Sequence, residues 1–121
     1  MGRFSISGNL TVDAIKDSKS TDYDVNLLRK ELLRALETAR SRLAIAIAEE
    51  SRSTPWDLRQ QYLDTADHMR RFVARLRNRE NREGFCMKNW ISALEALREI
   101  PVKDSARLLC RRLRSIVAAL E

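Results

Sequence analysis

Apolar residues recur at steps of three and four along residues 22–50, and this spacing predicts one long amphipathic helix. The stripe consists of Val25, Leu28, Leu32, Leu36, Ala39, Leu43 and Ile47, and it is widened by Leu27, Leu33 and Ile45. Such a helix would be roughly 40 Å long at about 1.5 Å per residue. Its length constrains the fold, because so long an apolar face has to be covered by several partner helices.

Three further helices are expected from the same periodicity. The second begins sharply, with Thr54 as its N-cap, Pro55 in the first helical position and Asp57 closing a capping box. Its core stripe is Leu58, Tyr62, Ala66, Met69, Val73 and Leu76, with Trp56 and Phe72 beside it. The third helix is expected over 86–99, with inward Trp90, Ala93, Leu94 and Leu97. The fourth runs from about 103 to 121, with inward Ala106, Leu109, Leu113, Ile116, Val117 and Leu120.

Turn-forming residues are scarce, with three glycines and two prolines among 121 residues. A β-rich domain needs more of them, and this length corresponds to about one domain. The sequence therefore predicts an all-α four-helix bundle over 21–121, with two long and two shorter helices. Residues 1–20 differ, because apolar and polar residues alternate around Gly8-Asn9, a hairpin turn signal. We expect a short N-terminal arm or β-hairpin there.

The chain lacks an apolar run of the ~18 residues that a membrane span requires, and its first residues lack the apolar region of a signal peptide. We therefore expect a cytoplasmic protein without a membrane partner. The two cysteines, Cys86 and Cys110, are expected to be reduced thiols, and a disulfide between neighbouring helices is the alternative.

The basic excess is local. The net charge is +6, yet residues 1–68 carry 10 basic and 11 acidic groups, whereas residues 69–121 carry 13 and 6. Of the 23 basic residues 18 are arginine, whose planar guanidinium matches phosphate or carboxylate oxygens better than an ammonium does. The second half of the chain is therefore expected to attract anions.

Arginines form two rows on the expected helices. The segment 70–82 holds six arginines against a single acid, Glu80, and four of them share one face: Arg71, Arg75, Arg79 and Arg82. The fourth helix places Arg107, Arg111 and Arg114 on one face, with Arg112 beside them. We expect few carboxylates one turn away to neutralise these rows. Two adjacent helices would merge the rows into one positive surface.

This surface suggests a non-enzymatic module that binds the phosphate backbone of RNA or DNA as an accessory subunit of a larger complex. The expected binding residues are Arg70, Arg71, Arg75, Arg79, Arg82, Arg107, Arg111 and Arg114. The alternative is an adaptor, chaperone or inhibitor that docks an acidic partner protein, with Phe85 as an anchor in a loop. The same pattern is also typical of a solvated arginine-rich surface.

Signatures of catalysis are missing from the sequence, which lacks a phosphate-binding glycine loop, a carboxylate pair and a nucleophile–base motif. We therefore expect no enzyme and no cofactor. His68 has Asp57, Asp64 and Asp67 nearby, but the pair Asp64 and His68 offers fewer ligands than a stable metal site needs, so no metal is expected. The long apolar helix 22–50 would also allow a homodimer.

Overall fold

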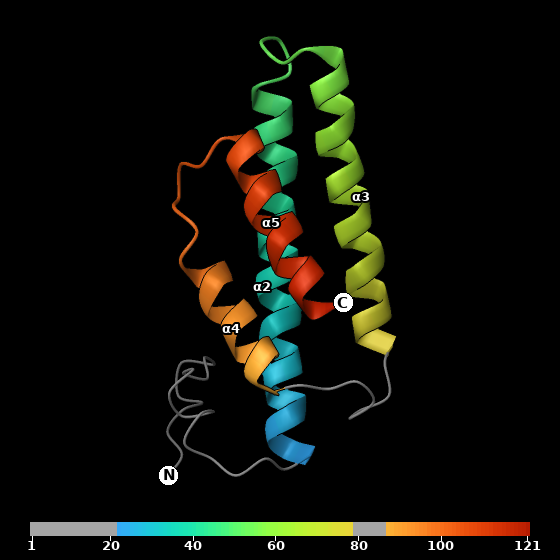
Figure 1. The fold of residues 1–121 in the computed structure, drawn as a ribbon, viewed down its shortest axis with the longest axis vertical. Coiled ribbons are helices and arrows are strands. Elements are labelled where there is room, and N and C mark those ends of the chain that lie inside the picture. Colours follow the sequence, from blue (N-terminus) through green and yellow to red (C-terminus); the bar gives the residue numbers. More distant parts are fainter. Residues whose placement is uncertain (1–21, 79–86) are drawn as a thin grey trace.

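A computed structural model describes residues 22–78 and 87–121, and within these ranges the chain forms four helices and no strand. They are α2 (Asp22–Glu49), α3 (Trp56–Asn78), α4 (Met87–Arg98) and α5 (Ala106–Leu120). Successive helices run in opposite directions, so the bundle is up-down-up-down (Figure 1). The predicted all-α fold with two long and two shorter helices is confirmed. The N-terminal arm or hairpin predicted for 1–20 lies outside the described residues.

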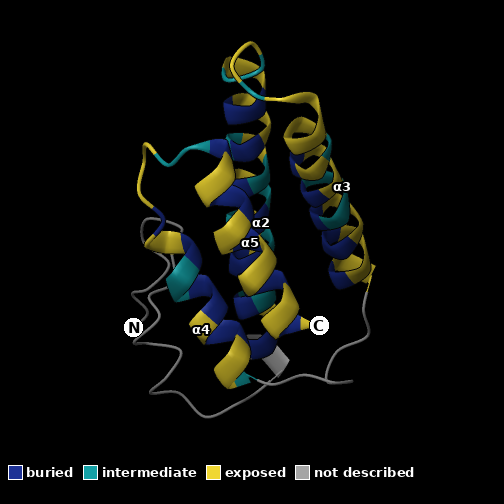
Figure 2. Cartoon of the chain, turned by 45° about the horizontal axis from the view of Figure 1, so that its top comes forward, coloured by how far each residue is buried: buried dark blue, intermediate teal, exposed yellow. Residues whose placement is uncertain are grey.

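α2 is the central helix, because it packs against each of the other three (Figure 1). Every residue of its predicted stripe is buried: Val25, Leu28, Leu32, Leu36, Ala39, Leu43 and Ile47. Leu27 and Leu33 are partly buried against the core, whereas the side chain of Ile45 is 58% exposed. Buried residues follow the sides of the helices that face one another (Figure 2). The one core of the described residues is thus built around the stripe that the periodicity predicted.

α3 contributes Tyr62, Met69, Phe72, Val73 and Leu76 to the core, as expected, together with Thr65. Two predictions for its first turn are wrong, because Leu58 and Trp56 are exposed. The α2–α3 turn extends past the start of α5 (Figure 1). The described helices therefore cover the first turn of α3 only in part, and Trp56 is left 70% exposed.

The start of α3 also differs from the prediction by one residue. The first helical backbone bond runs from the Arg59 N–H to the Pro55 carbonyl, so Pro55 occupies the capping position and Trp56 is the first helical residue. The Thr54 hydroxyl donates to the carbonyl of Glu50 at 2.7 Å instead. Thr54 therefore stabilises the turn at the end of α2.

α5 begins at Ala106, three residues later than predicted, because a turn closed by the Asp104 N–H and the Pro101 carbonyl precedes it. Ser105 is the N-cap, and its hydroxyl accepts from the Leu108 N–H at 3.3 Å. The Glu50 carboxylate accepts from the Ala106 N–H at 2.9 Å. A negative charge at a helix N-terminus is favourable. The end of α2 thereby fixes the start of α5.

The inward residues predicted for the last two helices are all buried, and Ile91 and Cys110 join them. None of the four described helices is both long and apolar enough to span a membrane.

Candidate nucleic-acid interface

The two helices that carry the predicted arginine rows, α3 and α5, lie side by side and run in the same direction (Figure 1). Arg114 of α5 donates from Nε to Thr65 Oγ1 at 2.6 Å and from a terminal nitrogen to the Gln61 carbonyl at 3.2 Å. Near the other end, Arg75 of α3 pairs with Glu121, just past α5, at 3.1 Å. The adjacency that a joint positive surface requires is therefore present.

Arg107, Arg111 and Arg114 form the α5 row, and all three are exposed. Residues spaced by four and three lie on one side of a helix. Arg114 contacts α3, so this side faces the seam between α3 and α5. Across residues 22–78 and 87–121, Arg107 and Arg111 make no ion pair, and Arg114 donates to neutral oxygens, the Thr65 hydroxyl and the Gln61 carbonyl. The α5 row therefore keeps its full positive charge.

The two described members of the predicted row on α3, Arg71 and Arg75, are both paired with carboxylates, contrary to our expectation. Asp67, one turn earlier, pairs with Arg70 at 2.7 Å and with Arg71 at 3.3 Å. Arg75 meets Glu121, which is distant in sequence. The hydrogen bond from Arg70 has the largest effect and lowers the pKa of Asp67; desolvation opposes it, and the charges of Arg71 and Arg70 lower the pKa further. Asp67 was not part of the expectation, because this residue precedes the arginine segment 70–82.

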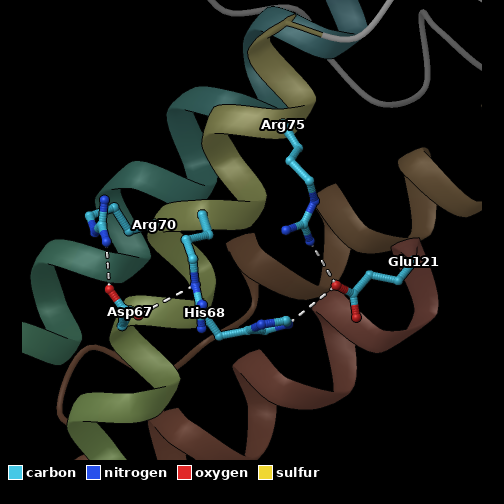
Figure 3. Close-up of polar contacts among 6 residues, drawn as sticks. Asp67, His68, Arg70, Arg75 and Glu121 are labelled. Atoms are coloured by element: carbon cyan, nitrogen blue, oxygen red, sulfur yellow. Dashed lines mark hydrogen bonds and ion pairs between the residues drawn. The ribbon is translucent and has the colours of Figure 1, made fainter.

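Arg70 does not share the side of α3 on which Arg75 lies. Figure 3 shows Arg70 directed away from Glu121, with Arg75 directed toward it. Five residues of an α-helix correspond to about 500°, so the two side chains point about 140° apart. Arg77 lies on the side of α3 that faces α2, where it pairs with Glu37 at 3.3 Å. Of the described arginines in the segment 70–78, Arg75 therefore meets the end of α5, and Arg71 lies one turn before it, about 40° around the helix.

The remaining predicted positions separate into two groups. Arg79, Arg82 and Phe85 lie outside the described residues. Arg112, expected beside the α5 row, instead pairs with Asp104 in the loop before α5, at 2.6 Å. Arg112 follows Arg111 by one residue, which turns it about 100° around the helix and away from α3.

A small polar cluster anchors the α5 row to the bundle. The buried Thr65 hydroxyl donates to the Gln61 carbonyl at 3.1 Å while accepting from Arg114. Cys110 is a buried free thiol beside it, and burial raises the pKa of this thiol, partly offset by a hydrogen bond with Thr65. The other cysteine, Cys86, lies outside the described residues. Thr65 thus holds one end of the row in a fixed place.

Three residues of this region were not predicted from the sequence to belong to it: Thr65, His68 and Glu121. His68 Nε2 lies 3.2 Å from the Glu121 carboxylate. Glu121 follows Arg114 by seven residues, so the helical period alone would have placed both on one side of α5. Their partners on α3 could not be identified without the tertiary structure.

We found no family model, no curated protein and no solved structure that matches this chain.

Proposed function

We propose that the chain is a non-enzymatic helical module, an accessory subunit of a larger complex, that binds the phosphate backbone of RNA or DNA through the α5 row. The observation that carries this proposal is the absence of any carboxylate paired with Arg107, Arg111 or Arg114 in the described parts of the chain. Three like charges on one side of a short helix repel one another. An external anion would relieve that repulsion.

Phosphate is the anion that fits this row best. Guanidinium groups donate two parallel hydrogen bonds to phosphate oxygens, and the row spans about 10 Å along the helix axis. A nucleic-acid strand offers repeated phosphates over such a distance, whereas a single small anion would engage one arginine. Arg75 lies at the end of the row and Arg71 one turn before Arg75 on α3, and both can join the row when a ligand displaces their own carboxylates.

A salt series tests this proposal. Retention of mixed-sequence RNA and of duplex DNA should be measured between about 50 and 200 mM salt. Because each neutralised phosphate releases counterions, three to five contacts predict a slope of log K against log salt of about −2.7 to −4.5 for duplex DNA and about −2 to −3.5 for single-stranded RNA. Absence of retention even at the lowest salt would contradict the proposal.

That negative outcome would favour the second candidate, a module that docks an acidic partner protein. The observation in its favour is the exposed apolar surface at the start of α3, where Trp56 is 70% exposed and Leu63 is 40% exposed. Large aromatic side chains are frequent anchors of protein interfaces. Phe85, the anchor predicted from sequence, lies outside the described residues.

Self-association through α2, which corresponds to the predicted helix 22–50, is a further proposal about partners. α3, α4 and α5 cover its predicted stripe, which leaves Ala44, Ile45 and Ala48 exposed near its C-terminal end. If two copies meet there, Ile45→Glu should convert a dimer into a monomer, because a buried charge without a partner is costly. Light scattering that gives the mass of one chain for the wild type would exclude the dimer.

A further inference from the structure

The carboxylate of Glu121 lies between two nitrogen-bearing side chains of α3 (Figure 3). Its Oε2 atom is 3.2 Å from His68 Nε2 and 3.1 Å from a terminal nitrogen of Arg75. His68 and Arg75 are seven residues apart, two helical turns, and they converge on one oxygen atom. Two donors from α3 therefore already hold an anionic group at the seam with α5.

Arg75 is held in place on a second side. Its guanidinium carbon lies 5.8 Å from the centre of the Phe72 ring, within the range of a cation–π contact. The same residues border an open hollow of about 360 Å³, lined by Phe72, Arg75, Leu76, Leu120 and Glu121. The hollow gives a group that is larger than a carboxylate room to approach Arg75.

We propose that His68 and Arg75 form a phosphate subsite, which Glu121 occupies until a backbone phosphate takes its place. This inference rests on the proposed function and extends it, because it adds His68 to the binding residues and gives Glu121 a competing role. Phosphate and carboxylate oxygens accept from the same donors, so one can replace the other. The subsite continues the α5 row, since Glu121 lies two turns beyond Arg114 on the same side.

The exposure of the three side chains makes the exchange feasible. The side chains of His68, Arg75 and Glu121 are 42%, 59% and 39% exposed, respectively. Exposed ion pairs of this kind contribute little to stability, because water and salt screen them. A polyanion that brings several phosphates at once can therefore displace a single carboxylate.

Glu121→Gln tests the competing role. Loss of the carboxylate charge should tighten binding of a fluorescently labelled mixed-sequence RNA by about two- to fivefold, as measured by anisotropy. Glu99→Gln, an exposed acid just after α4, is the matched control, because it changes the net charge equally and should give a clearly smaller effect. Equal or weaker binding by Glu121→Gln, with unchanged far-UV circular dichroism, would overturn the proposal.

His68 provides a second and independent readout, since it is the sole histidine of the chain. In the Glu121→Gln variant, the NMR signals of the His68 ring should shift on addition of RNA. The concentration of RNA phosphate that shifts them should be lower than the concentration of inorganic phosphate that does so. Equal responses to both probes would overturn the assignment to backbone phosphate. Signals that neither probe moves would overturn the subsite itself.

These experiments distinguish a failure of the subsite from a failure of the proposed function. If the wild type retains RNA while Glu121→Gln and the His68 signals remain unaffected, only the subsite is wrong. If the wild type retains no RNA, the proposed function fails, and inorganic phosphate still tests the subsite through the His68 signals.

Discussion

Replacing Leu113 with alanine is expected to lower the free energy of unfolding by about 3 kcal/mol. Leu113 is fully buried on α5, in the core cluster that residues of all four helices share. Truncation removes apolar contacts and leaves a cavity that this packed interior cannot fill by relaxing. Urea denaturation followed by circular dichroism measures the change as a lower midpoint with an unchanged slope.

Leu108→Ala is the matched control, because it makes the same substitution on the same helix at a side chain that is 40% exposed. Its effect should stay below about 1 kcal/mol, since much of the removed surface already contacts water. Equal losses for the two variants would mean that α5 does not pack on the bundle as described.

Much of this core could be predicted from the sequence, because apolar residues that recur with a period of 3.6 identify the side of a helix that faces the core. The α2 stripe is buried throughout for this reason. Three apolar residues on or beside the predicted stripes are nevertheless exposed: Ile45, Leu58 and Trp56. Whether an apolar residue at the end or the edge of a stripe is covered depends on where the neighbouring helices lie. Local periodicity contains no such information.

The charged surface was less predictable than the core. The α5 row follows from spacing alone, and so does the pairing of Asp67 with Arg70 and Arg71 within one turn. The partner of Arg75 does not, because Glu121 is 46 residues away in the chain. Which arginines remain unpaired therefore depends on how helices meet, and sequence spacing predicts candidates only.

The double substitution of Arg107 and Arg111 with glutamate is expected to have the largest effect on binding. Both side chains are exposed and make no ion pair within the described ranges, so their reversal removes no bond of the folded chain. The reversal replaces two attractive charges with two repulsive ones at the centre of the proposed interface. RNA affinity should therefore fall at least about tenfold at low salt, with little loss of stability.

Reversal of Arg52 and Arg59 is the matched control, because these exposed arginines are also unpaired within the described ranges. Arg52 lies in the α2–α3 turn, and Arg59 precedes Arg77 by five helical turns, which places it on the α2 side of α3. The control has the same net charge as the test variant. A difference between the two variants therefore reports the position of the charges.

The decisive measurement is an anisotropy titration of labelled mixed-sequence RNA with the wild type, the Arg107/Arg111 variant and the Arg52/Arg59 variant at one low salt concentration. Binding through the α5 row predicts a strong loss for the first variant and a much smaller loss for the second. Equal losses in both variants, or full affinity after reversal of Arg107 and Arg111, would show that this row is not the phosphate-binding surface.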